Sequence, residues 1–438
     1  MTAEPVTDSP WPLTSARDEA GRLTIGGVDV ADLAAGHGTP LWVVDEDDLR
    51  TRCRAYVEAF PDVWVAYASK AWCAVGILQI VAEEGLWIDV VSGGELHTAA
   101  VAGVPMDRVV FHGSNKSLAE LRSAAELGVG RIVADSFEEL DRLEAVGTEL
   151  DHTFRTWLRI TPGIDAHTHD YTRTGHDDSK FGFTLSLGLA DEAMRRTAEL
   201  PHVDVLGIHA HIGSQIFGTD PFVANAEVMI GLLARWRDEL GATLTECNLG
   251  GGMGIRYTTA DDPVTVAEYG AAVLAAVDRA CEEHDFPRPQ LAVEPGRAIV
   301  APAAVTLYEV GTIKRLPGLT TYVSVDGGMS DNIRPALYRA EHDVALVNRP
   351  AAGELEVCTV VGKHCESGDL VRDRVALPAD LVAGDLLAVA ATGAYTASMA
   401  SNYNRLPRPA AVLVRAGAVR LLQRRETYAD VVARDVVL

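Results

Sequence analysis

The chain has 438 residues, of which 48% are hydrophobic and 23% are charged, as in a folded protein of roughly two or three domains. Its formal net charge of −24 repels nucleic-acid phosphates and anionic membranes, so neither is an expected partner. The six cysteines have no CxxC pair or metal-ligand spacing, and the chain shows no signal peptide and no membrane-length apolar run. We therefore expect a cytoplasmic protein.

The first forty-odd residues are expected to lie outside the main domain. Residues 1–20 are acidic and contain three prolines, which predicts a flexible N-terminus. Residues 21–30 are short and strand-like. We expect the segment 21–44 to pair with a β domain formed by the C-terminal part of the chain.

Between residues 45 and 304, short apolar runs alternate with amphipathic segments. This alternation predicts βαβ units and a parallel sheet. Eight such units over about 250 residues fit a closed (β/α)8 barrel of the TIM type. An open doubly wound sheet is the alternative, but no GxGxxG opens the first unit. The expected strands are 63–68, 87–91, 108–112, 131–134, 154–161, 203–209, 243–249 and 291–294, with helices at 117–127, 136–146, 190–198 and 265–283.

From residue 305 to 438 the long amphipathic segments disappear. Apolar runs separated by turns predict an antiparallel β-sandwich or small β-barrel domain. The expected strands are 304–313, 320–325, 355–361, 386–391 and 410–414.

Polar residues gather where the expected barrel strands end, which is where barrel enzymes place their active sites. They are Lys70, Asp89, His112, His209, His211 and Glu294. Lys70 ends a β-patterned run, where an unpaired ammonium is costly to bury, so it indicates either a partner or a chemical task. One such task is a Schiff base with a carbonyl such as the aldehyde of pyridoxal phosphate.

Three consecutive glycines, Gly250, Gly251 and Gly252, follow another expected strand. Glycine lets the backbone approach a ligand closely and direct its N–H groups at a phosphate. The alternative is a flexible turn, for which two glycines would suffice.

The run His209-Ala210-His211 predicts two histidines on one face of a strand. We interpret them as facing the barrel interior, where an imidazole could stack on a planar cofactor. A paired-histidine metal site is the alternative, but no third ligand is spaced to complete it, so no metal is expected. The histidine-rich segment 165–169 is interpreted as a solvated loop.

The motif Glu294-Pro295-Gly296-Arg297 places a carboxylate and a guanidinium after the last barrel strand. A carboxylate facing a pyridine nitrogen would keep it protonated, and Arg297 could bind a substrate carboxylate in a bidentate way. An internal Glu–Arg ion pair is the plain alternative. In the β region, Cys365 is a candidate proton donor, since a free thiol is mainly protonated at neutral pH.

Together these motifs resemble the fold-type III pyridoxal-phosphate decarboxylases, the family shared with alanine racemase, over residues 24–430. The resemblance also rests on the segments 174–182, 326–332 and 334–338. It implies pyridoxal 5′-phosphate as cofactor, with Lys70 as its covalent attachment, His211 stacked on its ring and Glu294 at its ring nitrogen. It further implies cofactor contacts at Asp89, Ser214, Gly250, Gly251, Gly252, Gly296, Arg297 and Tyr395, and substrate contacts at Arg297, Arg334, Tyr338, Glu366 and Tyr395.

The resemblance implies decarboxylation of a small diamino acid, with Cys365 returning a proton to the reacting carbon. The first expected substrate is meso-2,6-diaminopimelate, which would yield L-lysine and CO2; ornithine, lysine and arginine are the alternatives. Ile333 and Arg339 depart from the family pattern beside the expected substrate pocket and leave this choice open. The residues matching Cys365 and Glu366 act across a subunit interface in the family, which implies a homodimer with shared active sites. A non-catalytic cofactor-binding or partner-binding homologue is less consistent, because Lys70 and Cys365 are both present.

Overall fold

The computed structural model describes residues 9–164 and 180–438. Its contacts divide the chain into two compact units. The first, here the β unit, comprises Met1–Arg52, Ile255–Asp262 and Ile299–Leu438, and the second, here the barrel unit, comprises Cys53–Gly254 and Pro263–Ala298. Within the described part of the chain, no helix has the length and apolar character needed to cross a membrane.

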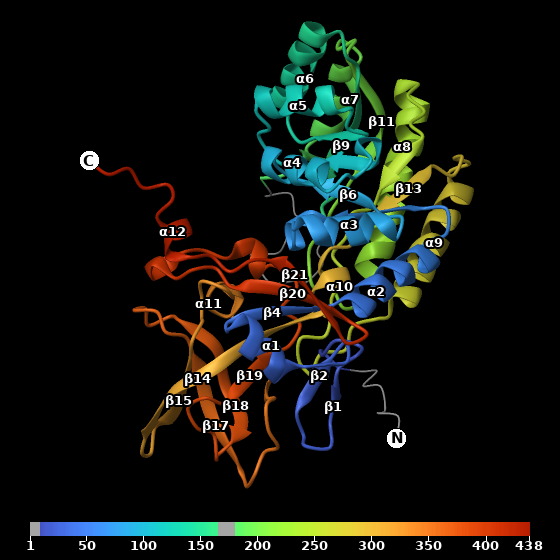
Figure 1. Cartoon of the computed structure of the whole chain (residues 1–438). Coiled ribbons are helices and arrows are strands. Elements are labelled where there is room, and N and C mark those ends of the chain that lie inside the picture. The colour runs from blue at the N-terminus through green and yellow to red at the C-terminus, as the bar shows by residue number, and fades with distance from the viewer. Residues whose placement is uncertain (1–8, 165–179) are drawn as a thin grey trace. The chain divides into compact units, whose positions relative to one another are not determined.

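The barrel unit contains eight parallel strands that close into a barrel, in the order β5-β6-β7-β8-β9-β11-β12-β13 with β13 paired to β5 (Figure 1). A ninth short strand, β10, pairs in parallel with the last two residues of β9. The strands are β5 (Trp64–Ala68), β6 (Trp87–Val90), β7 (Val109–Phe111), β8 (Arg131–Ala134), β9 (Phe154–Thr161), β10 (Phe183–Thr184), β11 (Val203–His209), β12 (Glu246–Asn248) and β13 (Gln290–Val293). The predicted barrel is therefore confirmed, and the open doubly wound sheet is not formed.

Helices connect successive strands of this barrel, as a parallel sheet requires. They are α3 (Val75–Glu83), α4 (Gly93–Val101), α5 (Leu118–Leu127), α6 (Phe137–Leu150), α7 (Leu189–Thr197), α8 (Asp220–Leu240) and α9 (Val266–Glu283), flanked by α2 (Glu46–Ala59) and α10 (Arg297–Val300). Ser117 and Thr265 begin α5 and α9 with capping boxes, in which each hydroxyl accepts from a backbone N–H and the glutamate three residues on returns the bond. These caps explain why the sequence predicted both helix starts closely.

A buried ion pair lies at the start of two barrel strands, opposite the end that carries the candidate site. Arg131 begins β8, and its Nε donates to Glu246 Oε2, at the start of β12, at 2.7 Å. The indole N–H of Trp157 donates to the same oxygen at 2.6 Å. The Glu246 carboxylate therefore receives donors from two other strands of the barrel and joins them inside the unit.

The β unit is built on one large sheet in the order β18-β17-β15-β14-β4-β20-β21, with β19 paired to β14 and β16 paired to β19. Its strands are β4 (Leu41–Asp45), β14 (Ala304–Leu316), β15 (Thr320–Val325), β16 (Val344–Leu346), β17 (Leu355–Val361), β18 (Leu370–Pro378), β19 (Leu386–Val389), β20 (Ala410–Arg415) and β21 (Ala418–Gln423). Short helices α11 (Arg334–Tyr338) and α12 (Tyr428–Val431) belong to the same unit. Most pairings are antiparallel, as predicted, but β15 with β17 and β4 with β20 are parallel.

The N-terminal segment joins this sheet through a later strand than the sequence indicated. Residues 21–30 were expected to return to the C-terminal sheet, but β2 (Leu23–Ile25) pairs with β1 (Ala16–Arg17) on one side and with β3 (Val28–Asp29) on the other, in a separate small sheet. The strand that enters the large sheet is β4, which pairs with β14 on one side and β20 on the other. Its five residues are all buried, as in a central strand.

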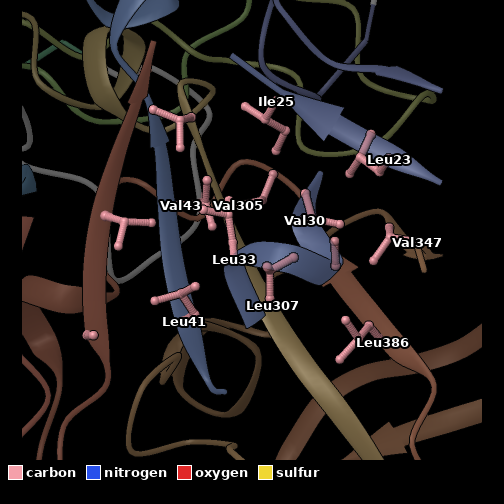
Figure 2. Packing of buried hydrophobic residues seen from close by; sticks show 14 residues of the cluster. Leu23, Ile25, Val30, Leu33, Leu41, Val43, Val305, Leu307, Val347 and Leu386 are labelled. Carbon is pink, nitrogen blue, oxygen red and sulfur yellow. The ribbon is translucent and has the colours of Figure 1, made fainter. Parts of the chain in front are cut away.

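One apolar cluster packs the N-terminal segment onto the large sheet of the β unit. Figure 2 shows Leu41 and Val43 of β4 beside Val305 and Leu307 of β14, with Leu33 of α1 (Val30–His37) lying over them. Leu41, Val43, Val305 and Leu307 are fully buried. Burial of each such side chain contributes about 1.5–3 kcal/mol, so this cluster fixes the first strands of the chain to the last domain.

Candidate active site

Lys70 lies directly after β5, in a short 3-10 helix, η1 (Ser69–Ala71). Its side chain is exposed, and its charge acts on Asp89 and His211 at the same end of the barrel. The Glu95 carboxylate of α4 accepts from Ser69 Oγ at 3.1 Å and from the Val91 N–H at 2.7 Å. Glu95 therefore ties the residue before Lys70 to the end of β6.

Glu294 is the centre of a buried hydrogen-bond network at the carboxyl end of the barrel strands. Its Oε1 lies 2.6 Å from His112 Nε2 and accepts from Asn248 Nδ2 at 2.6 Å, while its Oε2 lies 3.1 Å from His209 Nε2. These donors follow or end β7, β12 and β11, so the bonds cross the barrel interior. Burial alone would raise the pKa of Glu294, but its interactions with His112 and His209 outweigh burial and hold that pKa well below its usual range.

His209 is fully buried at the end of β11, as the strand alternation predicted. Burial lowers the pKa of His209 to about 4, against the opposing charge of Glu294, so the imidazole is neutral at neutral pH. Its Nε2 then carries the proton that is donated to Glu294, and its Nδ1 has no hydrogen-bond partner among the described residues.

The fold brings together a three-residue set that spacing in the sequence did not show. Ligand atoms of His112, His209 and Glu294 all lie within 4.8 Å of one another, which is compatible with a metal ion. Each histidine nitrogen, however, already faces the carboxylate as a donor. Metal-bound histidines usually donate their second ring nitrogen to a neighbour, and His209 Nδ1 has no such neighbour among the described residues. The network is therefore better explained as the support of one ionised carboxylate.

Asp89 lies in β6 beside this network. Burial raises the pKa of Asp89 to about 6, while His112 lowers it. His112 Nε2 lies 3.9 Å from Asp89 Oδ1, so the histidine stands between two carboxylates. The pKa values of Asp89 and Glu294 are thus moved apart, a pattern typical of active sites.

The three glycines after β12 lie in close backbone contact with neighbouring strand ends. A side chain on Gly250 would meet Ala210 O at 2.3 Å, one on Gly251 would meet Glu294 O at 2.0 Å, and one on Gly252 would meet Gly213 O at 2.3 Å. Asn248 Oδ1 also accepts from the Gly250 N–H at 2.8 Å. The triple glycine is therefore a sterically required loop, not merely a flexible turn.

Two further predicted residues lie next to the glycine loop. His211 is half-buried, and its Nδ1 accepts from the Gly251 N–H at 3.3 Å. Burial first, and then the positive charges of Lys70 and Arg159, hold the pKa of His211 well below its ordinary value, so this imidazole is neutral. The Arg297 Nη2 donates to Ser214 Oγ at 2.9 Å, which joins α10 to the loop after β11.

The β unit holds the remaining predicted residues, which are described within that unit. Arg334 begins α11 and is buried, with its guanidinium carbon 4.9 Å from the ring centre of Tyr257, 5.8 Å from Tyr338 and 6.0 Å from Tyr395. Three aromatic faces around one guanidinium restrict its orientation and favour its charge. Tyr257 was missed by sequence reasoning, since it lies far from α11 along the chain.

Cys365 and Glu366 lie in the loop between β17 and β18, and both side chains are exposed in the chain as described. The Cys365 N–H donates to Asn404 Oδ1 at 2.9 Å. The Gly368 N–H donates to Glu366, and this bond is the largest of the contacts that lower the pKa of the Glu366 carboxyl. Glu366 is therefore ionised at neutral pH.

The structure gathers the predicted residues into two sets. The barrel unit carries Lys70, Asp89, His211, Ser214, Gly250, Gly251, Gly252, Glu294, Gly296 and Arg297, and the β unit carries Arg334, Tyr338, Cys365, Glu366 and Tyr395. The segment 165–169 and residues 174–179 of the family motif lie outside the described residues. Glu95 and Asn248 were not predicted as site residues. The position of Asn248 two residues before Gly250 could have indicated it, whereas Glu95 lies 25 residues after Lys70 and is brought to Ser69 only by the fold.

The barrel residues fit the cofactor that the resemblance implies. Pyridoxal phosphate requires an amine, an anionic partner for its ring nitrogen and donors for its phosphate. Lys70 follows β5, Glu294 is ionised by its network, and Gly250–Gly252 form a closely packed turn with no side chain that could hinder a phosphate. The three requirements are met by residues at the same end of one barrel.

Comparison with known proteins agrees with this geometry. The family model described as the pyridoxal-dependent decarboxylase, pyridoxal binding domain, matches residues 46–301. Diaminopimelate decarboxylase from Bacillus subtilis is 48% identical over 427 residues, 97% of each chain, and that from Corynebacterium efficiens is 46% identical over 432 residues, covering 97% of this chain and 94% of its own. The crystal structure of diaminopimelate decarboxylase from M. jannaschii in complex with L-lysine superposes with a TM-score of 0.91 at 35% identity, covering 97% of this chain and 98% of that one.

Proposed function

The chain belongs to the diaminopimelate decarboxylase family of pyridoxal-dependent decarboxylases, and we propose that it converts meso-2,6-diaminopimelate to L-lysine and CO2. The observation that carries this proposal is the ionised, triply hydrogen-bonded Glu294 at the strand ends of the barrel. The relatives of nearly full length supply the substrate class, and the M. jannaschii structure contains the proposed product.

When bound, pyridoxal phosphate supplies a protonated ring that accepts the electron pair released as CO2 departs. Lys70 would hold the cofactor's aldehyde carbon, and Glu294 would keep a proton on the ring nitrogen. Because the pKa of Glu294 is well below its usual range, its carboxylate stays anionic and stabilises that proton. His112, His209 and Asn248 hold the carboxylate in position, and neutral His211 would lie against the ring face.

The phosphate would be held by the backbone of Gly250–Gly252, by Ser214 and by Tyr395. Gly296 and Arg297 are proposed as further cofactor contacts. The bond from Arg297 to Ser214 joins α10 to the loop after β11 that carries this proposed contact. Phosphate binding by backbone N–H groups needs close approach, which glycine allows. The same glycines are also required by packing, because a Cβ at any of the three would meet a carbonyl oxygen of a neighbouring strand end.

We propose that the β unit supplies substrate recognition. Arg334, Tyr338 and Tyr395 would bind a substrate carboxylate, and the anionic Glu366 would accept from the distal amino group. In the barrel unit, Arg297 is the proposed carboxylate contact. A diamino monoacid such as ornithine has no second carboxylate for Arg334, so the buried guanidinium in its aromatic cage favours diaminopimelate.

Two further proposals concern assembly and location. We propose a homodimer, because Cys365 and Glu366 are exposed on the β unit, where a second copy could use them. Cys365 would then give its proton to the carbon that has lost CO2. The free state of all six cysteines supports the expected cytoplasmic location.

The test is CO2 release from a panel of meso-, LL- and DD-diaminopimelate, lysine, ornithine and arginine. Turnover of the meso isomer well above the others is expected, with L-lysine as the product. A Lys70→Ala variant, checked for folding by circular dichroism, is the matched control and should release none. Preferred turnover of ornithine or arginine would overturn the substrate, and no turnover of any amino acid by cofactor-loaded protein would overturn the function.

A further inference from the structure

The loop that carries Cys365 is anchored by a buried aspartate that the proposed reaction does not use. Asp369 ends this loop, just before β18, and its side chain is almost fully buried. Its Oδ2 accepts from the backbone N–H of His364 at 2.8 Å and lies 2.8 Å from His364 Nδ1. His364 is the residue next to Cys365, so the pair fixes one end of the segment that carries the thiol and Glu366.

The same carboxylate reaches a second loop. Asp369 Oδ1 accepts from the Met329 N–H at 2.7 Å, and the Lys363 N–H donates to Gly327 O at 3.0 Å. The Gly327–Ser330 stretch leads into α11 through Asn332, whose Oδ1 accepts from the Arg334 N–H at 3.3 Å. One buried side chain thus joins the Cys365 loop to the loop that precedes the substrate-binding candidate Arg334.

Two glycines, Gly328 and Gly362, lie so close to the Asp369 carboxylate that neither position has space for a side chain. A Cβ on Gly328 would lie 2.4 Å from Asp369 Oδ1, and one on Gly362 would lie 2.2 Å from Asp369 Oδ2. Gly328 also has a φ of +148°, which a side chain rarely tolerates. Two glycines packed against one carboxylate indicate a built position for Asp369.

The ring of His364 also contacts a second segment of the β unit. Its ring is stacked on Tyr403, with ring centres 5.6 Å apart and planes within 7° of each other. Tyr403 OH reaches Glu366 Oε2 at 3.4 Å, and the neighbouring Asn404 accepts from the Cys365 N–H. The two residues beyond His364 are therefore contacted by the segment Tyr403–Arg405 (η5) from the other side.

We propose that the buried Asp369–His364 pair is a positioning element that fixes the Cys365–Glu366 loop and couples it to the loop before Arg334. This rests on the proposed function, because it assigns the pair a role in placing a proton donor and a substrate carboxylate site. Neither residue is a catalytic residue, since they act through Cys365, Glu366 and Arg334.

Asp369→Asn tests the coupling, because one oxygen and the charge are lost while the size is kept. Hydrogen exchange of the full-length, cofactor-loaded protein should become faster in both segments 327–332 and 362–368, and kcat should fall about tenfold or more with cofactor binding unchanged. Asp373→Asn is the matched control, since Asp373 lies on the same strand and bonds only Thr359 Oγ1, at 3.0 Å, among the described contacts. Its exchange in both segments and its kcat should be those of wild type.

A pair of histidine variants separates positioning from general stability. His364→Phe keeps the stacking on Tyr403 but loses the donor to Asp369, whereas His364→Asn keeps an N–H donor. The kcat of His364→Asn should be close to that of wild type, whereas the kcat of His364→Phe should be clearly lower. This difference is expected even if the two variants have the same thermal midpoint. If Asp369→Asn does not fold, this pair decides the matter.

Wild-type exchange and kcat in His364→Phe would overturn the proposal, as would equal kcat losses in the two histidine variants. Exchange is measured without substrate, so it stands apart from the proposed activity. If wild-type protein releases no CO2, the proposed function fails. Unchanged exchange in both segments overturns the positioning role whatever the activity.

Discussion

His112 Nε2 lies 2.6 Å from Glu294 Oε1, so a histidine that follows β7 and a carboxylate that follows β13 meet across the barrel interior. These strands are not neighbours in the sheet order. The contact therefore exists only because the barrel closes. The ionised state of Glu294 depends on this closure, since it brings the histidine to the carboxylate.

Glu294→Gln should lower kcat by about 10²–10³-fold, because a neutral amide no longer stabilises a proton on the ring nitrogen of the cofactor. Steady-state CO2 release, with cofactor content measured by absorbance, checks this. Glu227→Gln, which removes an exposed partner of Arg279, should keep wild-type kcat. Wild-type kcat in a fully loaded Glu294→Gln enzyme would contradict the role given to Glu294.

His209 should make the protein less stable as the pH falls. Its folded pKa of about 4 lies below the ordinary value of 6.5, so the unfolded chain binds a proton first and stability declines as the pH falls through this window. When His209 is fully protonated in both states, the free energy of unfolding is lower by about 3 kcal/mol than at neutral pH. Urea midpoints between pH 7 and 4.5 should therefore fall more steeply in wild type than in His209→Asn.

The control for this pH dependence is His97→Asn, because His97 is exposed on α4 and should leave the wild-type slope unchanged. Asp89, whose folded pKa is raised to about 6, acts in the opposite direction, and it is present in all three proteins. Equal slopes in wild type and His209→Asn would show that His209 is not held neutral by burial.

Glu246→Gln should lower the free energy of unfolding by about 3 kcal/mol or more, because it leaves the Arg131 guanidinium buried without a countercharge. The exposed pair Arg122–Glu149 is the matched comparison, and Glu149→Gln should leave the free energy of unfolding close to that of wild type. Urea unfolding of the two variants measures the difference. Similar losses in both would mean that Glu246 is not shielded from solvent.

Gly251→Ala should weaken cofactor binding at least about tenfold, because the new Cβ would lie 2.0 Å from Glu294 O and must displace the loop or β13. Gly218→Ala is the matched control, since no atom lies within 4 Å of its Cβ position. Fluorescence titration of the cofactor-free proteins with pyridoxal phosphate checks both. Tight binding by Gly251→Ala would remove the steric argument for the triple glycine.

The sequence predicted the elements whose own pattern defines them. The bounds of β9 and β11 were predicted correctly, because both are long apolar-alternating runs. In contrast, β16 is only three residues long, and β18 and β21 contain exposed arginines, so neither apolar alternation nor length marks them. Such strands form because they pair with segments far away in the chain, and their own residues do not show this.

The site residues also divide into those that the local sequence indicated and those that only the fold brings together. Lys70 and Glu294 were found because a charged residue at a strand end is unusual in itself. Glu95 and Tyr257 were missed, because each matters only through a neighbour that the fold brings to it: Ser69 for Glu95 and Arg334 for Tyr257. The low pKa of Glu294 could not be predicted either, since it depends on two histidines, His112 and His209, that two other strands bring to it.

The central place of β4 in the large sheet has a consequence for how the chain folds. Leu41–Asp45 pairs with β14 and with Ala410–Arg415. One of the first strands to be synthesised can therefore complete its hydrogen bonds only after one of the last strands has been made. During translation the barrel strands all leave the ribosome before that partner exists, and β4 keeps an unpaired edge throughout. Pairing of such distant segments is slow, so we expect completion of this sheet to be the late step of folding and the stage most open to aggregation.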